Sequence, residues 1–359
     1  MKKILVIASV MLFGFMSANA AGTDYGTDIT NSVTLSYDVG GNTQPDINAN
    51  DGAGFKVDRK VDVLVATTNP NNQVVNPGDN LVTDDHALTF TVTNETNGDQ
   101  DFILSLENLA TGVATLDAGE TDNMDLATDL KVCTDNPCTN DVTGLNQSFA
   151  EDQTRTYYVF ADVPIGTASG WASIALKATA VDDGTTNIMT DDSADPDSIA
   201  AVDIVFAEEA GVAAGDTVHH GEHSAFSTYE VEAAILAVTK TSCVLNDPVN
   251  GTTNPKRIPG ATIWYQLEVT NTGTGAAENV EIADTLNAAF GNSATNIAVH
   301  NGACPALTAN NNCGARVGAA EGNAHTGAGS ANVTVNFEDI GAAGSGTDVQ
   351  CGYIEVVIQ

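Results

Sequence analysis

The sequence predicts an all-β fold, with tandem immunoglobulin-like β-sandwich domains behind an N-terminal β-strand arm. Three observations lead to this fold class. Apolar and polar residues alternate over many short segments, which is the period of a half-buried strand. Turns rich in Gly, Asn, Asp and Thr separate these segments, as in a sandwich. The 359 residues include only 12 Lys and Arg, and this polar, weakly basic composition suits strands and loops rather than helices.

The start of the chain has the features of a secretory signal. Lys2 and Lys3 give a basic beginning, residues 4–16 form a short apolar run, and Ala18-Asn19-Ala20 is a small-residue cleavage site. We therefore expect a signal peptide over residues 1–20. No later segment has the ~20 apolar residues that a transmembrane helix requires. The expected location is secreted, extracellular or at the cell surface, without a transmembrane anchor.

An N-terminal arm is expected over residues 21–54. Its apolar residues alternate with polar ones and predict a single assembly strand, namely Ile29, Val33, Leu35 and Tyr37. Residues 40–54 are rich in Gly and Asn and are expected to form a loop. The strand has two alternative fates. It folds back as the first strand of its own sandwich, or it completes a sheet of a neighbouring copy by donor-strand addition.

A first sandwich is predicted over residues 55–227. Leu88, Phe90 and Val92 lie on one face of a strand, and a polar turn leads to the next strand. The segment 219–223, His-His-Gly-Glu-His, has residue types that bind transition metals. No rigid element is predicted around it, so we interpret it as an exposed loop.

A second sandwich is predicted over residues 228–359, with a strand at 229–240 entering it. Four apolar residues alternate on its next strand: Ile263, Tyr265, Leu267 and Val269. A turn of Asn, Thr and Gly follows, and a further strand begins near Val280. The same order of Pro-Gly, strand, Asn/Thr turn and strand occurs at residues 77–106, so we interpret the two domains as an internal repeat.

An even number of cysteines in an exported chain predicts disulfides. The six cysteines are Cys133, Cys138, Cys243, Cys304, Cys313 and Cys351. Proximity in the sequence predicts two local pairs, Cys133–Cys138 and Cys304–Cys313. The remaining pair, Cys243–Cys351, would join the two ends of the second sandwich. Zinc is the competing interpretation, but the paired C-x-x-C spacing of zinc sites is missing.

The formal net charge is −35. Such a charge repels nucleic acid and anionic lipid, so no nucleic-acid partner is expected. It favours solubility, or the binding of cations such as Ca²⁺. The acidic segments 182–184 and 191–197 are expected to be surface loops without a cofactor, with Ca²⁺ binding as the alternative.

Residues 259–286 resemble a repeat of bacterial surface proteins. They begin with Pro-Gly, continue as an alternating strand to Thr-Asn-Thr-Gly, and end with a strand that finishes in Asp-Thr-Leu. This order is similar to the family known as domain of unknown function eleven, and the resemblance is strongest over 238–286. Residues 21–31 also resemble the start of secreted bacterial proteins of this class. The resemblance implies an immunoglobulin-like fold, an extracellular or cell-surface location, a structural or adhesive role, and no catalytic residues.

The sequence contains no nucleophile elbow, zinc-protease helix, phosphate loop or dinucleotide fingerprint, so we do not expect an enzyme. The expected function is structural. The chain would be a subunit of an extracellular filament, biofilm matrix or surface layer, with copies of itself as partners in a head-to-tail homopolymer. The alternative is an extracellular adhesin or binding module with acidic, Ca²⁺-binding loops.

Overall fold

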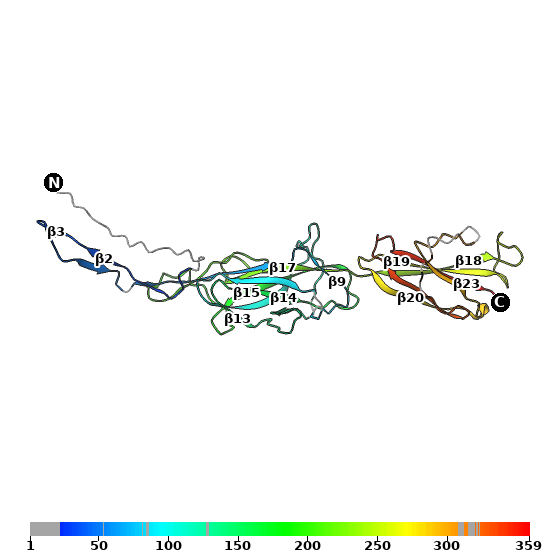
Figure 1. Cartoon of the computed structure of the whole chain (residues 1–359), viewed down its shortest axis with the longest axis horizontal. Helices are drawn as coiled ribbons and strands as arrows, with labels where there is room; N and C mark the ends of the chain where they lie inside the picture. The colour runs from blue at the N-terminus through cyan, green and yellow to red at the C-terminus, as the bar shows by residue number, and fades with distance from the viewer. Residues whose placement is uncertain are drawn as a thin grey trace.

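The computed structural model describes residues 22–52, 54–80, 82–83, 86–126, 129–307, 312–314, 320, 322 and 324–359. The predicted signal peptide lies outside these residues. The chain is all-β, as predicted: two β-sandwiches follow one another along the long axis, and a β-hairpin projects from the first (Figure 1). The described part of the chain has one short 3₁₀ turn, η1 (Ala288–Phe290), and no helix there is long and apolar enough to cross a membrane.

Sandwich 1 has a four-stranded and a five-stranded sheet. The first has the order β12 (Lys131–Cys133), β14 (Thr154–Phe160), β10 (Leu88–Asn94), β8 (Val63–Thr67). The second has the order β13 (Asn146–Phe149), β11 (Gln100–Asn108), β15 (Gly170–Val181), β17 (Glu222–Val231), β9 (Gln73–Val75). Neighbouring strands are antiparallel except β17 and β9. A parallel pair, β7 (Arg59–Val61) and β16 (Ile204–Phe206), lies beside these sheets.

The predicted alternating segments supply the core of sandwich 1. Phe90 on β10 and Phe102 on β11 are fully buried, and the ring of Phe102 meets that of Phe149 edge-on, with centroids 5.5 Å apart. Tyr229 is also fully buried, and its hydroxyl donates to the carbonyl of Val159 at 2.9 Å. Burial raises the pKa of this phenol, so the hydroxyl remains a neutral donor within the core.

Sandwich 2 is asymmetric. Its larger sheet has the order β18 (Leu236–Asn246), β19 (Thr262–Asn271), β23 (Val349–Val357), β21 (Thr295–Asn301). The opposite sheet consists of β20 (Ala277–Thr285) and β22 (Asn332–Ile340). The core between the sheets includes the predicted Ile263, Leu267 and Val269 of β19. A sheet of four strands is thus faced by a sheet of two.

The strand expected at 229–240 is two strands, and this part of the prediction was wrong. β17 continues to Val231 and pairs with β15 and β9, so it belongs to sandwich 1. β18 begins at Leu236 and pairs with β19 in sandwich 2. The alternation of large apolar residues lapses at Ala233-Ala234, where the chain passes between the domains. There the hydroxyl of Thr274 lies 2.9 Å from that of Ser169 in sandwich 1.

The segment 219–223 is only partly the exposed loop that we expected. Its first two histidines are exposed, but Glu222 and His223 lie on β17. The Nδ1 atom of His223 accepts a hydrogen bond from the backbone N–H of Val65 on β8, at 3.1 Å. This histidine therefore links the two sheets of sandwich 1.

Candidate functional site

A β-hairpin over residues 31–52 projects from the N-terminal end of sandwich 1 (Figure 1). β2 (Ser32–Leu35) pairs antiparallel with β5 (Ile47–Asn50), and β3 (Asp38–Val39) pairs with β4 (Asn42–Thr43). Two expectations about the arm were therefore wrong. The single strand is interrupted between Ile29 and β2, and the expected loop at 40–54 returns as the second strand of the hairpin.

The return of the chain follows from two adjacent glycines. Gly40 and Gly41 have φ angles of 59° and 88°. Positive φ at both central residues is the type I′ arrangement, whose twist matches that of the flanking strands. Beyond the turn, Ile47 and Ala49 alternate with two asparagines, which is a second half-apolar strand. The Gly-Gly pair was the signal in the sequence that would have predicted a hairpin.

One face of the hairpin is apolar and exposed. The register places Val33 beside Ala49 and, two residues on, Leu35 beside Ile47. These four side chains share a face because residues two apart lie on the same side of a strand. Val33, Leu35 and Ile47 remain 61%, 56% and 53% exposed. The hairpin thus presents a row of apolar side chains to solvent.

The other face of the hairpin is polar and internally bonded. The hydroxyl of Thr34 donates to Asn48 Oδ1, and that of Ser36 donates to Asp46 Oδ1, both at 2.6 Å. Within the described residues, β2 and β5 pair only with each other and with no strand of either sandwich. A two-stranded hairpin is marginally stable alone, and an apolar sheet face is normally covered by another layer.

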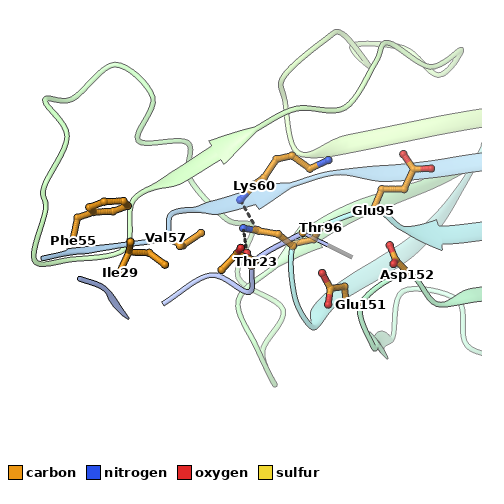
Figure 2. Close-up of a pocket in the computed structure, with 11 residues that line it drawn as sticks. Thr23, Ile29, Phe55, Val57, Lys60, Glu95, Thr96, Glu151 and Asp152 are labelled. Atoms are coloured by element: carbon orange, nitrogen blue, oxygen red, sulfur yellow. Dashed lines mark hydrogen bonds between the residues drawn. The ribbon is translucent and has the colours of Figure 1, made fainter. Parts of the chain in front are cut away.

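The hairpin is attached through a root that belongs to sandwich 1. β1 (Asp28–Ile29) pairs with β6 (Phe55–Lys56), and Figure 2 shows Ile29, Phe55 and Val57 grouped at this point. Tyr25 is held by the guanidinium of Arg59, which lies 4.4 Å from the centre of the phenol ring. Arg59 is itself buried and is therefore a rigid support for the root.

A shallow pocket of about 580 Å³ lies beside the root, with acidic side chains at its other end (Figure 2). Asn97 holds the chain here, because its Nδ2 donates to the Thr23 carbonyl at 3.1 Å and its Oδ1 accepts from the Lys60 N–H at 2.8 Å. The pKa of Glu151 is raised, first by burial and then by the charges of Asp24 and other nearby carboxylates.

The predicted assembly residues fall into two groups. Ile29 is half-buried at the root. Val33 and Leu35 lie on the exposed face of β2, and Tyr37, 41% exposed, precedes β3. Sequence reasoning missed the second strand, and so it missed Ile47 and Ala49, which complete the same apolar face.

Three disulfides join the six cysteines, and one of the predicted pairs is confirmed, Cys133–Cys138. The other two pairs were wrong, because the structure has Cys243–Cys313 and Cys304–Cys351. The sheet explains the correction. Strand β19 lies between Cys243 on β18 and Cys351 on β23. Strands with one strand between them lie about 10 Å apart, which is beyond the Cα separation that a disulfide spans.

The loop cysteines instead bond to the strands that they lie beside. His300 pairs with Cys351 across β21 and β23, so the chain leaving β21 brings Cys304 to that position. An isolated bridge between Val244 and Asn312 likewise brings Cys313, the residue after Asn312, to Cys243.

Among the residues that the structure describes, two clusters of three acidic side chains could hold a cation. In each, three carboxylate oxygens lie within 4.8 Å of one another: Asp58, Asp197 and Asp203 in one, and Asp117, Glu120 and Glu230 in the other. The predicted segment 191–197 contributes a residue to the first group, and 182–184 contributes to neither. One carboxylate of each cluster already accepts a hydrogen bond from the protein, since the N–H of Asp203 donates to Asp58, and the side-chain amide of Asn72 donates to Glu120.

Comparisons with known proteins do not assign the chain to a family. No protein-family model matches it, and no relative is found among curated proteins. Among solved structures, a two-domain protein of unknown function from Bacteroides fragilis is similar at 9% identity and a TM-score of 0.22. That similarity covers 82% of this chain and 88% of the other. It carries no functional argument.

Proposed function

We propose that this chain is a structural subunit of an extracellular filament, matrix or surface layer, and that copies assemble by β-strand addition of the N-terminal hairpin. The observation that carries the proposal is the hairpin itself: an amphipathic two-stranded ribbon with an exposed apolar face. The three disulfides fit an oxidising compartment outside the cytoplasm.

Strand addition suits this geometry for two reasons. Both outer edges of the hairpin carry backbone N–H and C=O groups that a neighbouring sheet can bond. The hairpin lies at one end of an elongated molecule, and sandwich 2 lies at the other (Figure 1). A contact between unlike ends is heterologous and does not close, so it produces a fibre.

The test uses negative-stain electron microscopy and sedimentation of the chain from residue 21 onward. A variant in which Gly-Gly replaces residues 31–52 removes the hairpin and keeps its root. A matched pair of substitutions separates the two faces, since Leu35→Asp charges the apolar face and Thr34→Asp charges the polar face. We expect filaments from the wild type and from Thr34→Asp, and dispersed particles from the other two. Dispersed wild-type particles, or filaments that survive loss of the hairpin, would reject the proposal.

The carboxylate groups favour a second candidate, an adhesin whose acidic loops bind Ca²⁺. A cation bound only by the folded state raises the melting temperature by mass action. The decisive measurement is the melting temperature with millimolar Ca²⁺ and with a chelator. An unchanged temperature rejects Ca²⁺ binding, and ligand binding that survives removal of the hairpin would support an adhesin over a filament.

A further inference from the structure

We infer that the hairpin of one copy docks in the groove between β18 and β20 of sandwich 2 in the next copy, adding to the free edge of β20. This inference rests on the proposed function, and it names the acceptor that the proposal lacks. It follows from the unequal number of strands in the two sheets of sandwich 2, and from the size and apolar face of the hairpin.

The mismatch is one of strand number. Within the described residues, the sheet β18-β19-β23-β21 is faced by the strands β20 and β22, and an isolated bridge joins Thr326 to Thr334 of β22. β22 lies against β21 and β23, and β20 pairs with β22 on the β18 side, where its Asp284 reaches Lys240 of β18. Within the described residues, β20 pairs with β22 on one edge and with no strand on the other. The small sheet therefore stops before it covers β18.

The inner face of β18 shows the consequence. Val238 lies beside Val269 of β19, so both side chains point toward the space between the sheets. Val269 is 2% exposed, whereas Val238 is 61% exposed, and Leu236 on the same face is 45% exposed. The inward side chains of β18 and β19 thus differ in exposure, because the opposite sheet covers β19 and does not cover β18. Val280 and Ile282 of β20 are half-buried and form the opposite wall.

An ion pair closes one end of this groove. Lys240 follows Val238 on the inner face of β18, and its Nζ lies 2.6 and 2.7 Å from the two carboxylate oxygens of Asp284 on β20. The same ammonium lies 4.5 Å from the centre of the Tyr265 ring. The pair fixes the separation of β18 and β20 and leaves the apolar stretch open toward the junction with sandwich 1.

The hairpin matches the groove in form. Two further strands would bring the small sheet from two strands to four, equal to the sheet opposite. The face that would turn inward carries Val33, Leu35 and Ile47, which are apolar and uncovered. Its paired strands are four residues long, about 13 Å, which is close to the length of β20 between Val280 and Asp284.

The charges of the two surfaces do not by themselves favour this pairing. Residues 28–55 contain no Lys or Arg, and the hairpin carries Asp38, Asp46 and Asp51. The described Lys and Arg residues of sandwich 2 are Lys240, Lys256 and Arg257. Lys240 is already paired with Asp284, and β20 itself carries Glu278 and Glu281, so the proposed contact rests on apolar surface and strand pairing rather than on charge.

Sandwich 1 offers no comparable groove in its described residues. Its sheets of four and five strands cover each other, and the exposed apolar residues of its edge strands, such as Leu64 and Val74, occur singly.

The experiment combines two chains that each lack one half of the contact. The chain without residues 31–52 keeps only the acceptor, and the variant Val238→Lys keeps only the hairpin. Val238 is exposed, so lysine there leaves the fold intact, which melting curves check. The matched control is Thr239→Lys, one residue along β18 on the other face.

We expect Val238→Lys to weaken assembly about 100-fold or more, since an unpaired ammonium is costly in an apolar contact. We expect Thr239→Lys to assemble like the wild type. The two defective chains, inert alone, should form a one-to-one complex by size-exclusion chromatography with light scattering. If Val238→Lys still polymerises, or if the mixture forms no complex, this inference is overturned while the filament proposal stands. If the wild type fails to polymerise, the proposed function itself fails.

Discussion

At the scale of single residues, Glu230 shows how the acidic composition affects stability. Its side chain is half-buried near Asp117 and Glu120. Its pKa is raised, first by burial and then by the charges of Glu120, Glu232 and Asp117. A carboxyl whose folded pKa is raised lowers stability above its unfolded pKa, because the folded state resists the charged form.

We predict that Glu230→Gln raises the free energy of unfolding at pH 7 by up to about 1 kcal/mol, the range for charge interactions that solvent partly screens. The gain should disappear below about pH 4, where the carboxyl is protonated in both states. Urea unfolding of the variant and the wild type, at pH 7 and below pH 4, measures this difference in the free energy of unfolding. Glu209→Gln, at an exposed glutamate, is the control and should change little at either pH. A loss of stability in Glu230→Gln at pH 7 would show that the carboxylate is held by an attractive partner.

At the scale of elements, the disulfides of sandwich 2 can be read by peptide mapping. Cleavage at Lys240, Lys256, Arg257 and Arg316 separates the peptides 241–256, 258–316 and 317–359. With Cys243–Cys313 and Cys304–Cys351, all three should remain joined without reductant. Further cleavage after Leu307 separates Cys304 from Cys313. It should leave two disulfide-linked pairs of peptides, one with Cys243 and Cys313 and the other with Cys304 and Cys351. We expect reduction to release every peptide in both digests.

The pairing that proximity predicted would give a different map. The peptide 258–316 would be free with an internal bond, and 241–256 would be joined to 317–359. That result would contradict the strand arrangement of sandwich 2, since β19 would then no longer separate β18 from β23.

The same elements show what the sequence could predict. Alternation at Leu88–Val92 and Ile263–Val269 predicted buried strand faces correctly, because burial on one face imposes a period of two. The pairing of strands or cysteines that lie far apart in the sequence produces no such periodic pattern in the sequence. Proximity therefore misled the prediction of two disulfides, and the boundary between the sandwiches was placed inside β17. Only the first strand of the hairpin was predicted, because its apolar and polar residues alternate clearly. The turn at Gly40-Gly41 and the second strand were interpreted as a loop.

The uncovered inner face of β18, the proposed acceptor, could not have been predicted from the sequence. Val238 and Val269 both occupy inward positions of alternating strands. Only the number of strands in the opposite sheet determines that one is covered and the other is exposed. Strand number in a sheet depends on tertiary packing, which local patterns do not record.

At the scale of the whole molecule, the charge of −35 opposes association between copies. Assembly therefore requires a specific contact with enough apolar surface to offset this repulsion. An elongated subunit with its hairpin at one end and its incomplete sandwich at the other would give a filament with two unlike ends (Figure 1).

Unlike ends make filament growth sensitive to subunits that carry only one half of the contact. A chain without residues 31–52 can bind a hairpin at one filament end but offers none to the next subunit, so it terminates growth there. We predict that one such chain among roughly ten wild-type subunits shortens filaments to about ten subunits, as expected for head-to-tail addition. Electron microscopy of mixtures at fixed total concentration measures the length. The double variant that also carries Val238→Lys lacks both halves and should leave the length unchanged, and equal shortening by both chains would show that copies associate through some other surface.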